Sequence, residues 1–249
     1  MTDSREAEIS RATWDEFARE DAMWYVCASP EKKQSWDADG FYATGKDSVG
    51  LFLGQLPLGG MLVEIGCGLG RMTFALAPHF TRVIGIDVST EMIKRADERK
   101  ISSAIENVEF HVNDGRTVPV ESSTADACLS YLVLQHMPSR DLVKGYIKEM
   151  GRVLRPGGRA VIQLPLVPST PKGRMLYAVR RVIDGLEAIR GAFRRHPTVR
   201  SRAYRGVRLT ESGLRSAARD SGLEIEILTD TRRSWYDTYY TFAKLDRPA

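Results

Sequence analysis

Three glycines lie within five positions of the segment 62–76, LVEIGCGLGRMTFAL, where an apolar run gives way to a helix-like pattern. Gly66, Gly68 and Gly70 follow a predicted strand and precede a predicted helix, so their loop can take positive φ angles and let a ligand approach the backbone. The dinucleotide fingerprint has its third glycine where this chain has Arg71, and no Gly-Lys-Ser/Thr follows as in a triphosphate loop. The loop therefore predicts a nucleotide-like ligand of another kind.

Acidic residues close the next two predicted strands. Asp87 ends the run RVIGID, 21 residues after Gly66, where a carboxylate can accept hydrogen bonds from two ribose hydroxyls. Asp114 follows the third strand in FHVNDG. Structural alternatives stay open, because Asp87 or its neighbour Ser89 could cap a helix. Likewise, Asp114 and Gly115 could form a simple turn.

Apolar runs of strand length alternate with helix-period segments and would position these residues. The strand-like runs are MLVEIG, RVIGID, VEFHVND, ACLSYLVL and RAVIQL, and a helix capped by Thr210 then leads to LEIEILTD and TYYTFAKL. This alternation is typical of an α/β fold with a parallel sheet.

Composition narrows the class of protein. The 249 residues, 43% of them hydrophobic, suffice for one well-buried α/β domain with added segments. The three cysteines show no paired spacing, which argues against a disulfide framework and favours a cytoplasmic protein. Four histidines are scattered without ligand spacing, so we expect no metal site. No apolar run approaches the length that spans a bilayer.

Charge is concentrated in one segment. Residues 166–209 hold one lysine and ten arginines against one aspartate and one glutamate, a net charge of +9, so the rest carries −5 of the total of +4. Apolar residues recur there at helical spacing: Met175, Leu176, Val179, Val182, Ile183, Leu186, Ile189 and Phe193. The pattern predicts a basic amphipathic helix. It could cover an acceptor site, pair with another subunit, contact a membrane or lipid through residues 174–195, or simply pack on the sheet.

At five places the chain resembles the class I S-adenosylmethionine-dependent methyltransferases. The matching stretches are VEIGCGLGRMT, GIDVSTEMI, VNDG, DACLSYLVLQHMP and RVLRPGGRAVI, and the resemblance covers about residues 60–164 and 210–245. It implies a Rossmann-like, seven-stranded, mostly parallel sheet with an antiparallel last strand and helices on both faces. We accordingly predict an N-terminal helical cap over 1–55, a core of 56–165 and 209–249, and a helical insertion over 166–208, between strands five and six.

The resemblance further implies S-adenosylmethionine as cofactor and S-adenosylhomocysteine as product. Glu64 and the glycine loop would surround the methionine part, Asp87 would hold the ribose, and residues 113–115 would meet the adenine. The implied cofactor residues are Glu64, Gly66, Cys67, Gly68, Gly70, Asp87, Val88, Met92, Asn113, Asp114 and Gly115. A carboxylate and backbone groups, without a phosphate-binding lysine, suit a sulfonium with a zwitterionic tail better than a pyrophosphate.

Candidate catalytic groups follow the fourth strand. His136 is a candidate general base if the acceptor must lose a proton, although it could instead only bond the loop backbone. Tyr131 and Gln135 share its loop. The predicted catalytic residues are His136, Tyr131 and Tyr239, and the predicted substrate-binding residues are Tyr42, Gln135, Arg180 and Tyr236.

An apolar, arginine-rich lid suits a small acceptor with an apolar body and an anionic group, and we expect O-methylation by a monomer or homodimer. Two alternatives stay open. One is an RNA methyltransferase, which the isoelectric point near 9.0 permits; against it, no separate RNA-binding module is evident, and the fourth strand ends in SYLVLQH rather than in an Asn/Asp-Pro-Pro-aromatic motif. The other is a catalytically silent protein that binds S-adenosylmethionine.

Overall fold

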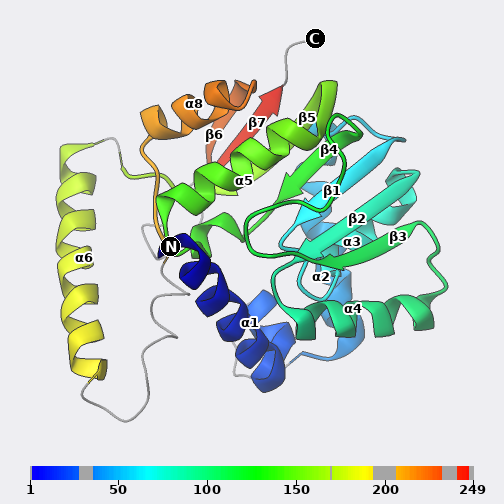
Figure 1. Ribbon diagram of the computed structural model, residues 1–249, viewed down its shortest axis with the longest axis horizontal. Coiled ribbons are helices and arrows are strands. Elements are labelled where there is room, and N and C mark those ends of the chain that lie inside the picture. The colour runs from blue at the N-terminus through cyan, green and yellow to red at the C-terminus, as the bar shows by residue number, and fades with distance from the viewer. Residues whose placement is uncertain (1, 28–35, 169, 193–205, 232–239, 247–249) are drawn as a thin grey trace.

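A seven-stranded sheet with helices packed against it organises the computed structural model, which describes residues 2–27, 36–168, 170–192, 206–231 and 240–246 (Figure 1). The strands are β1 (Met61–Ile65), β2 (Arg82–Asp87), β3 (Val108–Val112), β4 (Ala125–Ser130), β5 (Leu154–Leu164), β6 (Glu224–Thr231) and β7 (Tyr240–Asp246). They lie in the order β3-β2-β1-β4-β5-β7-β6. Strands β1 to β5 pair in parallel, and β7 runs antiparallel to both neighbours. The predicted Rossmann-like parallel sheet is confirmed.

Short polar residues begin several of the helices. The helices are α1 (Thr2–Val26), α2 (Ala38–Gly50), α3 (Arg71–Leu76), α4 (Thr90–Ser103), α5 (Arg140–Val153), α6 (Pro171–Ala192) and α8 (Glu211–Asp220), with short 3-10 turns at Leu53–Gln55, Ala77–His79 and Leu134–His136. Ser89 caps α4, Ser139 caps α5 and Thr210 caps α8, each accepting a hydrogen bond from a backbone N–H of the first turn. The predicted cap at Thr210 is confirmed.

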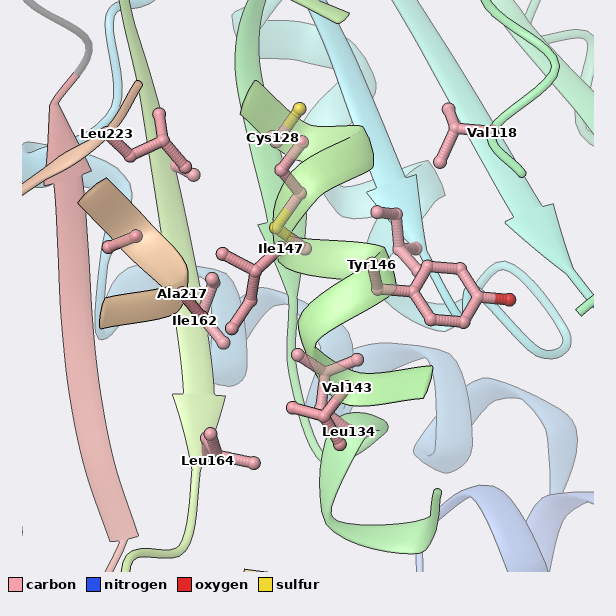
Figure 2. Close-up of a cluster of buried hydrophobic side chains, with 14 of the residues drawn as sticks. Val118, Cys128, Leu134, Val143, Tyr146, Ile147, Ile162, Leu164, Ala217 and Leu223 are labelled. Carbon is pink, nitrogen blue, oxygen red and sulfur yellow. The ribbon is translucent and has the colours of Figure 1, made fainter. Parts of the chain in front are cut away.

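The sheet buries apolar side chains on both faces because successive strand residues point to opposite sides. Val63 and Ile65 of β1 belong to the cluster formed with α5 and α8, whereas Leu62, which precedes them, belongs to the cluster formed with α3 and α4. Figure 2 shows the first cluster, where Val143 and Ile147 of α5 lie against the strands. This packing fixes the carboxyl ends of the parallel strands at one edge of the sheet.

Helix α1 is tied to the segments that follow β2 and β3. Arg11 Nη2 donates to the carbonyl of Asn113 at 2.7 Å. Asp15 Oδ1 accepts from Ser89 Oγ at 2.6 Å and from the backbone N–H of Glu91 at 3.1 Å. Near its end the helix is kinked at Asp21, whose φ of −166° and ψ of 78° are not helical. These bonds hold α1 across the carboxyl ends of the strands.

The basic segment contains the predicted helix, but the helix lies apart from the sheet (Figure 1). Five of its apolar side chains are exposed, with exposed fractions between 47% and 63%: Met175, Leu176, Val179, Val182 and Ile183. Packing of these side chains on the sheet is therefore not what the structure shows. Within the described ranges, no helix is long and apolar enough to cross a membrane.

The two ends of the basic segment return to the same place. Leu166 pairs with Leu209 in an isolated parallel bridge, and the N–H of Val167 donates to the Leu209 carbonyl at 2.8 Å. The N–H of Val207 donates to the carbonyl of Met137 at 3.1 Å. Helix α6 thus belongs to a segment whose two ends meet beside the loop that follows β4.

Candidate cofactor and acceptor site

A cavity of about 320 Å³ opens at the carboxyl ends of β1, β2 and β4, beneath α1, within the range of small-molecule sites. Twelve of the predicted site residues line it: Glu64, Gly66, Cys67, Gly68, Asp87, Val88, Met92, Asn113, Gly115, Tyr131, Gln135 and His136. Helix α1 adds Ala7, Ser10 and Trp14. The structure therefore brings together residues that span more than a hundred positions of the sequence.

The glycine loop needs its glycines for conformation and for space. Gly66, Gly68 and Gly70 have φ angles of 77°, 53° and 76°, a region that side chains disfavour. A Cβ at Gly66 would overlap the side chain of Val133, and one at Gly68 would lie 2.9 Å from Val26. Gly70 is the N-cap residue before α3 and does not line the cavity. Two of the three glycines therefore leave bare backbone on the cavity.

Asp87 ties this loop to the start of α4. Its Oδ2 accepts from the N–H of Gly68 at 2.9 Å, and its Oδ1 accepts from the N–H of Ser89 at 2.9 Å. Burial raises the pKa of Asp87, and these backbone donors partly oppose that rise. Because Ser89 itself caps α4, Asp87 is not the helix cap that the sequence left open.

Glu64 is a second buried carboxyl at the cavity, with 4% of its surface exposed. Its Oε2 accepts from Thr73 Oγ1 at 2.6 Å. Burial raises the pKa of Glu64 to about 7, against the opposing effects of the Thr73 hydrogen bond and of the charge on Arg71. The Glu64 carboxyl can therefore change its protonation near neutral pH when a charged ligand binds.

The beginning of α3 places a buried cation at the same cavity. Arg71 is 4% exposed, and its Nη1 donates to Thr44 Oγ1 at 3.1 Å and to Ser48 Oγ at 2.9 Å, both on α2. It forms no ion pair with any residue that the structure describes, and its Nε has no acceptor among them. In the sequence, Arg71 drew attention only because it stands where the dinucleotide fingerprint has its third glycine. That exchange of a glycine for a cationic residue was the signal that could have identified Arg71 as a site residue.

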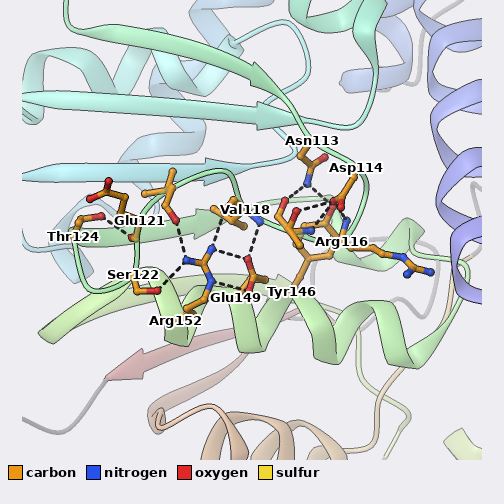
Figure 3. A network of polar contacts seen from close by, with 12 residues as sticks. Asn113, Asp114, Arg116, Val118, Glu121, Ser122, Thr124, Tyr146, Glu149 and Arg152 are labelled. Carbon is orange, nitrogen blue, oxygen red and sulfur yellow. Dashed lines mark hydrogen bonds and ion pairs between the residues drawn. The ribbon is translucent and has the colours of Figure 1, made fainter.

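Asn113 stands at the cavity below α1. Its Nδ2 donates to the Thr117 carbonyl and to the Tyr146 hydroxyl, each at 2.9 Å (Figure 3). Its Oδ1 is buried without a hydrogen-bond partner in the part of the chain that is described. Tyr146 of α5 also lines the cavity, and sequence reasoning missed it. The amide oxygen of Asn113 can thus accept a hydrogen bond from a ligand.

Asp114, in contrast, does not line the cavity. Its Oδ1 accepts from the N–H groups of Arg116 and Thr117 at 2.9 and 2.7 Å, and from Thr117 Oγ1 at 3.0 Å (Figure 3). This is the turn that the sequence left as an alternative, with Gly115 at a φ of 82°. The carboxylate of Asp114 organises the loop that carries Asn113.

Cys67 lines the cavity as a neutral thiol. Burial raises its pKa well above the usual range, and the nearby Asp87 and Glu64 add to that rise. The thiolate is the nucleophilic form of cysteine. Cys67 therefore serves the site as an apolar wall.

The loop after β4 forms the opposite wall. The imidazole of His136 meets the edge of Trp14 with ring centroids 5.6 Å apart. Gln135 Nε2 lies 3.1 Å from His136 Nε2. Tyr131 packs its ring against Phe52 at a centroid distance of 5.5 Å. This end combines aromatic surface with a polar pair.

Four other predicted residues either do not line the cavity or have side chains that the structure does not describe. The hydroxyl of Tyr42 donates to the Leu69 carbonyl at 3.2 Å, and its ring lies under Arg99, so the structure does not bring it to the cavity. Tyr236 and Tyr239 lie outside the described residues. Arg180 falls within α6, but its side chain is outside the description.

Comparisons with known proteins agree with this geometry. Residues 63–162 match a family model described as a methyltransferase domain. The chain is 34% identical over 142 residues to 27-O-demethylrifamycin SV methyltransferase of Amycolatopsis mediterranei (strain S699), which covers 55% of this chain and 51% of that protein. It is 33% identical over 111 residues to the tRNA (carboxymethyluridine(34)-5-O)-methyltransferase ALKBH8 of Mus musculus, covering 45% of this chain and 15% of that one. The chain thus spans about half the length of these relatives or less.

A solved structure supports the fold along nearly the whole chain. Magnesium protoporphyrin IX methyltransferase from Synechocystis PCC 6803, with bound S-adenosylhomocysteine, superposes with a TM-score of 0.64 at 18% identity. The match covers 96% of this chain and 99% of that one. The family match and the relatives show that residues 63–162 form a methyltransferase domain, and the solved structure shows that the chain has the fold of the class I S-adenosylmethionine-dependent methyltransferases.

Proposed function

We propose that this protein binds S-adenosylmethionine in the cavity beneath α1 and transfers its methyl group to a small acceptor. One observation carries the proposal: the carboxyl groups of Glu64 and Asp87 meet the buried guanidinium of Arg71 at the cavity, and Arg71 forms no ion pair with a described carboxylate. Burying a charge without a partner costs several kcal/mol. A ligand with both a carboxylate and positive charge relieves that cost.

The residues fit this cofactor group by group. The Arg71 guanidinium would hold the methionine carboxylate, and Glu64 would hold the ammonium. Asp87 would accept hydrogen bonds from the ribose hydroxyls, and the orphaned Oδ1 of Asn113 would accept from the adenine amino group. Gly66 and Gly68 supply the bare backbone that lets the ligand approach.

A bound sulfonium supplies a methyl group that is already activated for displacement. The chain's own contribution is alignment of the acceptor and exclusion of water. Helix α1, held by Arg11 and Asp15, covers the cavity and supplies Trp14 to its wall. We propose that residues 1–55 act as this cap and that 56–165 with 209–249 form the core.

For the acceptor we propose a small molecule with an apolar body and an anionic group, methylated on oxygen. The ends of the segment 166–208 meet beside the loop after β4, since the N–H of Val207 donates to the carbonyl of Met137. Helix α6, within this segment, exposes apolar side chains. The segment's net charge of +9 suits an anion. We propose that it acts as a lid, with Arg180 among its acceptor contacts.

An RNA acceptor is the second candidate. Similarity to a tRNA methyltransferase and the concentration of arginine in residues 166–209 favour it. A catalytically silent protein that binds the cofactor is the third, because the cavity residues serve binding in either case.

Labelling distinguishes the three. Purified protein is incubated with methyl-labelled S-adenosylmethionine and a lysate of its host, and the label is partitioned among lipid, small-molecule, RNA and protein fractions. We expect label in the lipid or small-molecule fraction and none with Asp87→Ala. Label in RNA would replace the small acceptor by the second candidate. Absence of label, with S-adenosylhomocysteine still bound in calorimetry, would favour the silent binder.

A further inference from the structure

A chain of amide groups reaches from the sheet interior to His136. Gln163, on β5 and 1% exposed, accepts at Oε1 from the N–H of Leu132 at 2.9 Å. Its Nε2 donates to Gln135 Oε1 at 3.5 Å, the longest of the three hydrogen bonds in this series. Gln135 Nε2 then meets His136 Nε2 at 3.1 Å.

The backbone fixes the direction of this chain. A backbone N–H can only donate, so the atom of Gln163 that faces Leu132 must be its oxygen. The amide nitrogen of Gln163 then faces Gln135, which turns its own oxygen inward and its nitrogen toward the imidazole. Reversing any one amide would set donor against donor or acceptor against acceptor. His136 Nε2 therefore accepts, and in the neutral ring the proton lies on Nδ1.

Leu132 shows that this arrangement is built into the fold. Its φ of 60° is left-handed backbone, which a bulky residue rarely adopts because its Cβ crowds the following carbonyl oxygen. That conformation places its N–H on Gln163 and leaves Leu132, Gln135 and His136 on the cavity. Non-glycine residues in such strained conformations cluster at functional sites.

We infer that Gln163 and Gln135 hold His136 as the Nδ1–H tautomer with its Nε2 lone pair occupied, so that His136 positions the acceptor instead of deprotonating it. This rests on the proposed function. The acceptor must then arrive as an anion such as a carboxylate. Its oxygen supplies the electron pair for the new C–O bond, the C–S bond breaks with its pair left on sulfur, and no proton has to be removed.

The tautomer is measurable without an acceptor. Long-range ¹⁵N–¹H correlation spectra of the protein with S-adenosylhomocysteine distinguish protonated from unprotonated ring nitrogens, and loss of one of the four histidine patterns in His136→Asn assigns the signal. We expect an unprotonated Nε2 and a protonated Nδ1. Gln135→Met should return the ring to the Nε2–H form that free imidazole side chains prefer.

Gln163→Met tests the buried end of the chain. It keeps the side-chain length but can neither accept from Leu132 nor donate to Gln135, so the tautomer of His136 should shift although Gln163 does not touch the ring. If this variant fails to fold, Gln135→Met on the half-buried loop still decides. An Nε2–H ring in the unaltered protein overturns the inference.

The rate of label transfer gives a second readout. A lost general base reduces the rate by about 10²–10⁴-fold, whereas His136→Phe, which keeps an aromatic ring beside Trp14, should reduce it by less than about tenfold. A loss of a hundredfold or more overturns the positioning role. Calorimetry with S-adenosylhomocysteine and label transfer by the unaltered protein keep the outcomes separate, because failure of the proposed function appears as loss of cofactor binding or as absence of label, whatever the tautomer.

Discussion

Two regions, the cavity beneath α1 and helix α6, depart from the usual rule that charged side chains are exposed and apolar side chains are buried. Glu64 and Arg71 are charged groups buried at the cavity, whereas Leu176 and Val179 on α6 are large apolar groups left exposed. A buried unpaired charge calls for a small charged ligand, and an exposed apolar face calls for an apolar partner. In our proposal, cofactor binding and acceptor recognition are therefore carried by separate parts of the chain, which mutation can separate.

The largest effect is expected on the cavity side, at Asp87. Asp87→Ala removes the carboxylate that bonds Gly68 and Ser89 and, in our proposal, two ribose hydroxyls. With about 1.5–3 kcal/mol for each charged hydrogen bond, S-adenosylhomocysteine should bind about 1,000-fold more weakly in calorimetry. Leu176→Ser is the matched control and should bind it normally. Near-normal affinity of Asp87→Ala would contradict the site assignment.

Stability should depend on pH through Glu64. Its pKa is raised from 4.5 to about 7 in the folded protein, so the folded state keeps a proton that the unfolded chain releases. The free energy of unfolding should therefore fall as pH rises from about 4.5 through 7, by about 3 kcal/mol in all. Urea unfolding at pH 5 and pH 8 measures the fall. Glu64→Gln should abolish this part of it, and an equal fall in both proteins would refute the assignment.

Arg71 should recognise the carboxylate of the cofactor. Arg71→Met should weaken S-adenosylhomocysteine binding about 10- to 100-fold, the loss of one charge-assisted pair. Binding of 5′-methylthioadenosine, which lacks the carboxylate, should change less than about threefold. Because the variant also loses the hydrogen bonds to Thr44 and Ser48, urea unfolding of the free protein is measured alongside to separate a loss of stability from a loss of binding. Equal weakening of both ligands would assign Arg71 a purely structural role.

The smallest effect on stability is expected at α6. Leu176→Ser and Val179→Ser should each change the free energy of unfolding by less than about 0.5 kcal/mol, since both side chains are exposed. Ile147→Ala in α5 (Figure 2), fully buried, should cost about 2–5 kcal/mol. Once an acceptor is known, the serine variants should raise its KM and leave cofactor affinity unchanged. A clear loss of stability would instead mean that α6 packs on the body of the protein.

Local pattern accounts for what could be predicted. The alternation of strand and helix periods predicted the parallel sheet, and Thr210 predicted the start of α8. Gly66 and Gly68 predicted a loop open to a ligand, because positive φ is a property of the residue itself. Asp87 was predicted at the cavity because the carboxyl ends of parallel strands meet at one edge.

The direction in which side chains point is what the sequence pattern could not predict. Asp114 and Asn113 are neighbours in sequence, yet the first forms a turn and the second lines the cavity. Tyr42 was predicted at the substrate and instead donates to the carbonyl of Leu69. Sequence pattern gives the element and its approximate end, but neighbouring residues point in opposite directions at a strand end, and the loop conformation decides between them.

The sequence by itself determined the family, the order of the strands' hydrophobic runs and the concentration of charge in residues 166–209, because each is written in residue types at short spacing. Only the tertiary structure decided that Arg71 lacks a counter-ion among the described residues, that α6 exposes its apolar side chains and that Gln163 reaches the loop of His136. Leu132 and Gln163 are 31 positions apart. Contacts of this kind depend on strand register and on packing between elements, which no local pattern of residues encodes.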